Sequence, residues 1–109
     1  MNDFATPPNH IKFLAKRLFG NCGRIIDGAI AYLEPGGGGP ETDHTHAHDH
    51  LFIVVSGQAT IRLGGERKTL NPNEAFLVKG GIPHSVWNSD AQTTVMVGIS
   101  VEAEERKNA

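Results

Sequence analysis

Short apolar runs separated by glycine, proline and asparagine turns repeat along most of the chain. From residue 25 onward each run has the length and alternation of a β-strand, and Gly64-Gly65 is a two-residue turn of the kind that closes a hairpin. Strands are predicted over residues 28–34, 51–55, 58–63, 66–70, 74–78, 84–88 and 92–101. Short strands at this spacing favour an all-β sandwich or barrel in one domain.

The segment before these strands fits two patterns. Ile11, Leu14 and Leu18 have helical spacing behind a possible Asn9 cap, whereas residues 11, 13, 15 and 19 share the alternation of a strand. The run from Pro35 to Pro40, with four glycines between its prolines, is expected to be a flexible loop. We therefore divide the chain into an N-terminal arm (1–27), packed on the barrel or on a partner, a barrel (28–101) and a charged tail (102–109).

Histidines gather in one short stretch. Four of the six in the chain are His44, His46, His48 and His50, and a fifth, His84, follows a Gly-Gly-Ile-Pro turn. Residues two apart in a strand face the same way, so His44 and His46 project together, with Cα atoms roughly 6.5 Å apart. His50 joins them if the strand bends or bulges. Surface histidines that bind metal loosely are the alternative, but strict alternation favours a specific metal site.

Composition excludes several other classes. The chain has 109 residues, with 10 basic against 12 acidic side chains, so it lacks the positive charge of a nucleic-acid-binding surface. No apolar run approaches the roughly 18 residues that span a bilayer, and the N-terminal segment does not read as a signal peptide. Its single cysteine, Cys22, fits a reducing compartment. We expect a cytoplasmic protein that binds neither nucleic acid nor membrane.

Residues 38–57 read G-x5-H-x-H-x3-H-x6-G, which resembles the first motif of the cupins, except that His50 stands where that family usually has Glu. Gly81, His84 and Asn88 match the second cupin motif, whereas Asn73 and Lys79 replace its Gly and Pro. The chain therefore resembles a small single-domain cupin of the type-2, RmlC-like superfamily. The resemblance implies a double-stranded β-helix, the jelly-roll barrel.

The resemblance also implies a ligand set for one divalent transition metal per chain. The metal ligands carried over from the motifs are His44, His46, His50 and His84. His48 holds a position that is often not a ligand, and we expect it either to support the site from outside or to face solvent. Imidazole ligands suit Fe, Zn, Ni and Cu, so ligand type does not choose among these metals.

A pocket beside the metal should be lined by residues that share the alternation of the ligands. The candidates on this ground are Tyr32, Phe52, Val54, Val86 and Asn88. No catalytic residue can be assigned from the sequence.

Two functions remain open from the sequence. An all-histidine site leaves a metal its full charge, which favours a metal-dependent enzyme acting on a small metabolite, either a dioxygenase or a sugar or uronate isomerase or lyase. The alternatives are a non-catalytic domain that binds or senses a small ligand or metal, and a structural zinc site. Exposed edge strands invite pairing between two chains, and small cupins commonly form dimers, so we expect a homodimer.

Overall fold

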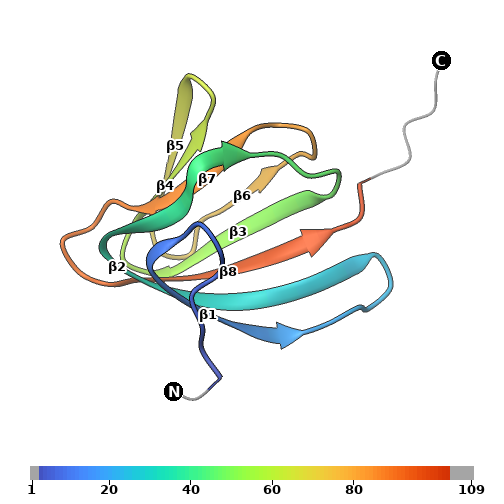
Figure 1. Cartoon of the computed structure of the whole chain (residues 1–109), viewed down its shortest axis with the longest axis horizontal. Coiled ribbons are helices and arrows are strands. Elements are labelled where there is room, and N and C mark those ends of the chain that lie inside the picture. The colour runs from blue at the N-terminus through green and yellow to red at the C-terminus, as the bar shows by residue number, and fades with distance from the viewer. Residues whose placement is uncertain (1–2, 104–109) are drawn as a thin grey trace.

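The computed structural model describes residues 3–103, apart from the side chain of His44, and within that range it consists of strands without a helix (Figure 1). The turn spacing predicts an all-β sandwich or barrel, and the structure is an all-β, nearly closed barrel. The strands are β1 (Ile11–Phe19), β2 (Ile25–His44), β3 (Asp49–Ser56), β4 (Ala59–Leu63), β5 (Glu66–Leu70), β6 (Ala75–Val78), β7 (His84–Asn88) and β8 (Thr94–Val101).

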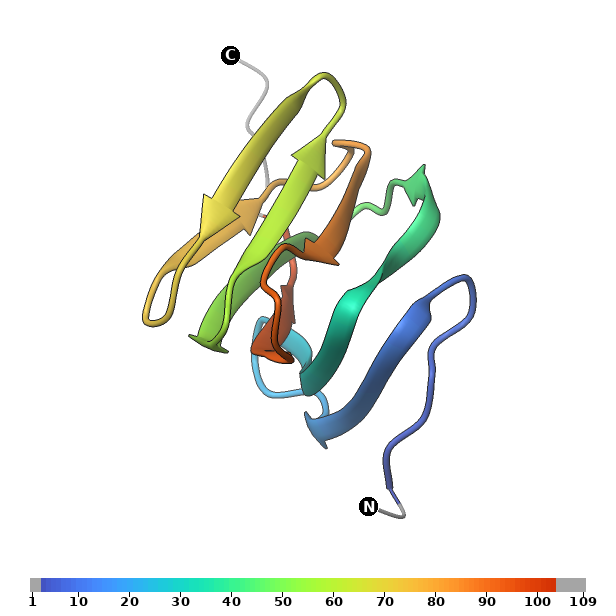
Figure 2. The same cartoon turned by 90° about the vertical axis from the view of Figure 1, so that its left-hand side faces the viewer.

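All strand pairs are antiparallel, and the sheet curls into a nearly closed barrel with the order β5-β4-β7-β2-β8-β3-β6. Strand β2 belongs to both halves of the barrel: residues 25–33 pair with β8, whereas Gly38, Gly39 and His44 pair with β7. Figure 2 shows β5, β4, β7, β2 and β1 side by side across one face. The two strands that carry the histidine-rich segment and His84 thus become neighbours.

The N-terminal segment is a strand, which settles the ambiguity between helix and strand. β1 pairs with β2 of its own chain, with Leu14 opposite Tyr32 and Lys16 opposite Ile30. The local pattern fits a helix and a strand about equally well. Backbone pairing with β2 decides between these two periodicities in favour of the strand.

The expectation of a flexible loop at residues 35–40 is wrong. These residues continue β2, and a Cβ added at Gly37 would collide with the carbonyl of Lys12, whereas one at Gly38 would collide with the carbonyl of Val86. The glycines therefore let β1 and β7 approach β2 closely, and Gly36, Gly38 and Gly39 also have positive φ values, of 79°, 157° and 149°, which residues with a side chain rarely adopt.

Inward-facing side chains fill much of the barrel. They form a dense core that includes Leu33, Val54, Ile61, Leu70 and Val78. Further inward positions line a cavity. No helix within residues 3–103 has the length and hydropathy to cross a bilayer.

Candidate metal centre

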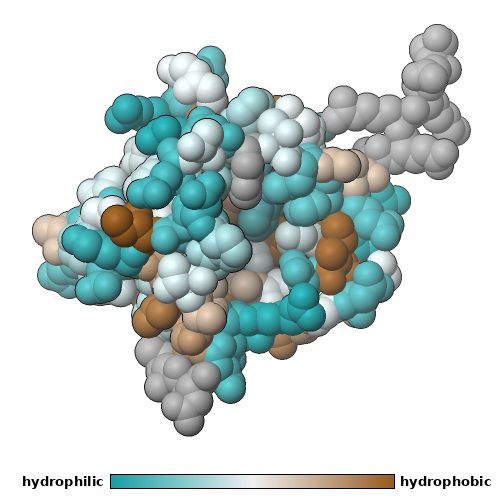
Figure 3. Space-filling view, viewed as in Figure 1, coloured by the Kyte–Doolittle hydropathy of each residue, from teal (hydrophilic) through white to brown (hydrophobic). Residues whose placement is uncertain are grey.

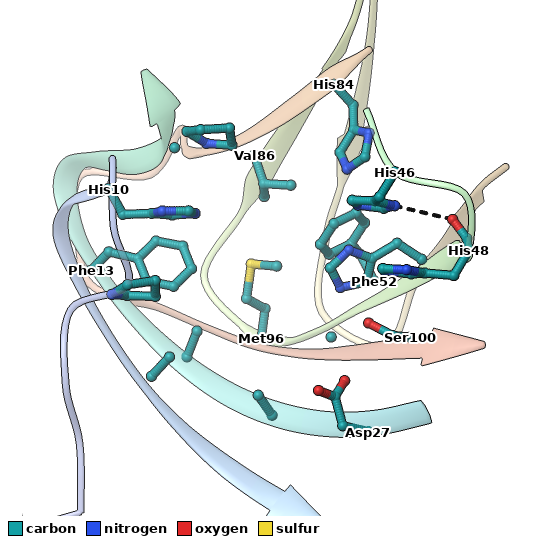
Figure 4. A pocket seen from close by; sticks show the side chains of 18 residues that line it. His10, Phe13, Asp27, His46, His48, Phe52, His84, Val86, Met96 and Ser100 are labelled. Carbon is teal, nitrogen blue, oxygen red and sulfur yellow. Dashed lines mark hydrogen bonds between the residues drawn. The ribbon is translucent and has the colours of Figure 1, made fainter. Parts of the chain in front are cut away.

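Three histidines converge where β2 passes into β3. His46 and His48 lie in the connection between these strands and His50 lies on β3, and one ring nitrogen of each lies within 4.8 Å of the others (Figure 4). All three side chains are half-buried. This is the donor set that transition metals such as zinc, iron, copper and nickel bind.

His46 lies at the centre of the histidine cluster. Its ring stacks on that of His48 with centroids 3.9 Å apart and planes at 4°, and it meets His84 edge-on at 4.9 Å. The ring of His50 lies 5.7 Å from that of His46 and 6.2 Å from that of His84. His84, which is buried, therefore adjoins the three converging rings from the opposite strand, β7.

Backbone carbonyls fix the tautomers of two of these rings. His46 Nδ1 donates to the carbonyl of His48 over 3.1 Å, and His84 Nδ1 donates to the carbonyl of Ile82 over 2.9 Å. A carbonyl oxygen only accepts, so Nδ1 carries the proton and the neutral ring has its lone pair on Nε2. Metal-binding histidines are oriented in this way. The residues present therefore fit a bound metal ion.

Two contacts hold the histidine segment against the turn that precedes β7. The amide of Gly81 donates to the carbonyl of His46 over 2.8 Å, and the amide of Gly80 donates to a carboxylate oxygen of Asp49 over 2.8 Å. Gly80 packs so closely on the carbonyl of Ala47 that no Cβ fits there. These contacts fix the position of His46 relative to His84 without any metal.

Burial favours the neutral form of two histidines. It lowers the pKa of His84, and the neighbouring positive charge of His46 lowers it further, although the bond to Ile82 opposes this shift. Burial also lowers the pKa of His48, against the opposing effect of Asp27 and Asp49. Metal binding requires a neutral imidazole, so the surroundings favour the state that binds.

The lowered pKa of His84 predicts how the metal-free protein responds to pH. Below pH 6.5, the ordinary value, the unfolded chain takes up a proton that the folded ring resists, so the free energy of unfolding falls as the pH falls, until the folded ring itself is protonated. Well above pH 6.5, where the ring is neutral in both states, His84 contributes no slope. Urea unfolding of chelator-treated protein across this range measures the effect, and a His84→Asn variant should give a flatter profile. An unchanged profile in the variant would contradict it.

A cavity of about 310 Å³ opens beside the histidines, and Figure 3 shows this face of the molecule hollowed near its centre. Its wall is polar at the histidine end and mostly apolar elsewhere. It is lined by Pro7, His10, Phe13, Ala15, Asp27, Ala29, Ala31, Gly39, Pro40, His46, His48, His50, Phe52, His84, Val86, Met96, Gly98 and Ser100.

Of the four ligands taken from the motifs, the structure brings His46, His50 and His84 together. The His44 side chain lies outside the part of the structure described, although its backbone pairs with that of His84. His48, which was expected to support the site from outside or to face solvent, lies next to His46 and His50 in the group of rings that converge.

Two of the five expected pocket residues, Phe52 and Val86, line the cavity. Val54 and Asn88 also face inward, but one position deeper, where Val54 joins the core and Asn88 is held by hydrogen bonds. Tyr32 has the opposite alternation from Ala31, which lines the cavity, and its ring meets that of Phe4 at 5.5 Å instead. The register of β2 against β8 decides this direction, and one sequence does not reveal it.

Sequence reasoning missed several cavity residues, above all Asp27 and His10. Asp27 pairs with Ser100 of β8, and Ser100 pairs with His50 of β3, so these three inward-facing residues form one row across the sheet. A strand predicted to begin at residue 25, and not at 28, would have placed Asp27 on the same face as the residues of β2 that line the cavity. No local signal places His10 there, because it precedes β1 and reaches the cavity only through the fold.

Gly98 leaves room for the ring of His50, since a Cβ at this position would lie 3.0 Å from His50 Nε2. We expect Gly98→Ala to displace that ring and to weaken metal binding about tenfold, which corresponds to about 1.4 kcal/mol. Titration against a competing chelator measures the change. Gly65→Ala is the matched control because nothing lies within 4 Å of a Cβ there. Equal affinities in the two variants would contradict the expectation.

A jelly-roll barrel with histidines converging at the wall of its cavity defines a class of small β-barrel domains equipped to bind a metal. The family model described as "Cupin domain" matches residues 29–101, and the chain belongs to this family. The predicted membership in the cupins is thereby confirmed, whereas the place of His50 at the position of the usual Glu stays a prediction.

Similar proteins differ widely in what their names describe. The chain is 38% identical over 56 residues to a mannose-1-phosphate guanylyltransferase of Salmonella montevideo, a match that covers 51% of this chain and 12% of that protein. It is similar to the Cupin_2 domain of an XRE family transcriptional regulator from Enterobacter cloacae (23% identity, TM-score 0.72, 88% of this chain and 100% of that one). A predicted oxalate decarboxylase from Thermotoga maritima gives 15% identity and a TM-score of 0.73, covering 83% and 80%. At these identities the solved structures establish the fold alone.

Proposed function

We propose that this protein is a metal-dependent enzyme that acts on a small metabolite at a mononuclear site. The observation that carries the proposal is the convergence of His46, His48 and His50 within 4.8 Å at the wall of a cavity of about 310 Å³, with His84 beside them. A cavity at the lower end of the usual range for ligand pockets suits a small molecule.

The histidine set supports a metal with coordination positions left for substrate. Catalytic metal sites commonly use three protein ligands and keep at least one position open, whereas structural zinc sites are closed by four. A divalent iron, zinc, nickel or copper ion held by these rings would polarise a substrate oxygen and lower the pKa of a bound water. The carbonyls of His48 and Ile82 would keep the rings of His46 and His84 in the binding tautomer.

Asp27 supports catalysis over simple binding. Its carboxylate lines the same cavity, in one row with Ser100 and His50, and its charge reaches the cluster, where it opposes the lowering of the His48 pKa by burial. We assign Asp27 the role of general base, which accepts a proton from the bound substrate. A metal site made of histidines alone does not supply such a base. The reaction classes that fit are a dioxygenase and a sugar or uronate isomerase or lyase. A cytoplasmic location stays a prediction.

Elemental analysis of untagged protein, purified without a nickel column, tests the proposal. We expect about one iron, copper, nickel or zinc ion per chain. Cobalt(II)-substituted protein should change its visible spectrum when azide is added, because azide occupies an open position. Stoichiometric metal that azide does not perturb would favour a closed, structural site instead.

Asp27→Asn separates an enzyme from a sensing domain. In the proposed enzyme this variant keeps its metal and its azide response but loses turnover in a screen for oxygen uptake and metabolite conversion. The control is Asp90→Asn, on the exposed connection between β7 and β8, which should keep its metal, its azide response and its turnover. A wild-type protein with an open metal site that turns over nothing in that screen would support the non-catalytic reading.

We propose further that two copies pair through the outer face of the barrel. On this face Ile30, Val97 and Ile53 lie in one register row across β2, β8 and β3, and Leu77 on β6 is 41% exposed. An apolar face of this kind covers itself in a twofold dimer. Sedimentation should give a dimer, and Val97→Glu should give a monomer, whereas Thr69→Glu on the exposed strand β5 should not. A monomeric wild-type protein would overturn this.

A further inference from the structure

His10 is a polar residue held at the end of the cavity remote from the histidine cluster. Figure 4 shows its ring across the cavity from His46, with Phe13 below it and Val86 and Met96 between the two ends. It reaches this position from the segment that precedes β1, so it comes from a different part of the chain than the cluster.

The ring of His10 is fixed on several sides. It packs against Phe13 with centroids 4.6 Å apart, and Gly39 lies so close on β2 that a Cβ there would be 2.8 Å from the ring. The preceding residue, Asn9, adopts a φ of 66° and accepts a hydrogen bond from the amide of Glu41 over 3.0 Å. A side chain held this firmly loses little entropy when a ligand binds.

A single hydrogen bond sets what this ring offers to a ligand. His10 Nδ1 donates to the carbonyl of Pro8 over 2.8 Å. Because a carbonyl only accepts, the proton lies on Nδ1 and Nε2 of the neutral ring is an acceptor. A ligand hydroxyl is one donor that suits such an atom.

The wall between His10 and the cluster is apolar. Phe13, Phe52, Val86 and Met96 line it. The other lining residues of β2 and β8 are alanines, glycines and Pro40, apart from Asp27 and Ser100 at the cluster end. Each hydroxyl of a sugar placed here would lose its bonds to water without replacement, which costs on the order of 1–3 kcal/mol per group. A hydrocarbon or aromatic segment fits instead.

We infer that His10 binds the end of the ligand remote from the metal, with Nε2 accepting a hydrogen bond from a ligand hydroxyl. The ligand is then a short molecule with a metal-chelating head, an apolar middle and a terminal hydroxyl. This inference rests on the proposed metal site, and within the proposed reaction classes it weighs against a sugar substrate.

The test uses the cobalt(II)-loaded full chain and two matched series of probes. The first series is the alkanohydroxamic acids, whose hydroxamate group chelates metals, and the second adds a terminal hydroxyl at each chain length. Dissociation constants follow from the cobalt spectrum or from calorimetry. We expect the hydroxyl to strengthen binding about threefold to tenfold at one chain length and to weaken or not change it at the others.

Two variants separate a ligand contact from a merely structural role. His10→Asn places an amide N–H where Nδ1 lies and so retains the bond to Pro8, but it lacks an atom at the position of Nε2. His10→Gln reaches that position with its terminal amide. We expect His10→Asn to lose the preference for the hydroxylated probe and to bind the plain probe as the wild type does, and His10→Gln to restore part of the preference.

The outcomes are distinct. If the plain probe binds the cobalt protein but the hydroxyl gives no preference at any length, or if His10→Asn keeps the preference, the role of His10 is overturned and the metal site stands. If the protein takes up no stoichiometric cobalt, the proposed function fails and the inference fails with it.

Discussion

His46→Ala should abolish stoichiometric metal binding. His46 is the ring that contacts both His48 and His84, and its tautomer is fixed by the carbonyl of His48. Removing a group that hydrogen-bonds to a metal-binding histidine costs about 10–100-fold in metal affinity. Removing the central ring itself should therefore cost at least about 100-fold. Competition against a chromophoric chelator gives the affinity, and circular dichroism establishes that the variant is folded.

The matched controls come from the other histidines. His10→Ala removes an imidazole at the far end of the cavity and should leave the metal affinity within about threefold of wild type. His48→Ala should behave like His46→Ala, because its ring lies among the three that converge. A His48→Ala protein that retains full affinity while His44→Ala loses it would favour the ligand set taken from the sequence motifs over the structural one.

Asn88→Asp should strongly destabilise the barrel although it is isosteric. Asn88 is 8% exposed, and its Nδ2 donates to the carbonyls of Leu33 and Gln92, each over 2.8 Å. Its Oδ1 accepts from Thr94 Oγ1 over 2.8 Å. Aspartate has the same size but no N–H, so two carbonyls lose their donor and a charge is buried beside them. We expect a loss of about 3 kcal/mol and a fall of roughly 10–20 °C in melting temperature.

Asn21→Asp makes the same chemical change in the exposed turn between β1 and β2 and should shift the melting temperature by less than about 2 °C. Calorimetry on metal-free protein measures both variants, so that metal binding does not contribute. A small effect at Asn88 would mean that water or a neighbouring side chain replaces the lost donor.

Most strands after β2 were predictable because they are short runs with apolar residues, closed by turn residues. The hairpin at Gly64-Gly65 is the clearest case, since β4 ends before it and β5 begins after it, although β5 (Glu66–Leu70) is mostly polar and follows from the turn alone. The glycine run around Gly37 and Gly38 was wrongly predicted to be a flexible loop. Glycine is typical both of flexible segments and of places where two backbones approach closely, and only the neighbouring strands decide which applies.

The candidate site was predictable as far as it is local in sequence. His46 and His50 follow from spacing, and the motif resemblance adds His84. The place of His48 depends on how the chain turns between β2 and β3, which alternation along an ideal strand cannot give. Asp27 and His10 enter the cavity through the pairing of β2 with β8 and through the course of the arm before β1, both of which are properties of the whole fold.

Three of the converging rings come from five consecutive residues, 46–50, and only His84 comes from a distant strand. A segment this short can chelate a metal even when the chain is unfolded. Ligand that binds the unfolded state offsets part of the stabilisation it gives the folded state. The metal should therefore raise the melting temperature by less than its affinity for the folded protein implies. Only the affinity that the folded state has in excess of the unfolded state stabilises the fold. That excess comes from bringing His84 to the cluster, across a separation of 34 residues from His50.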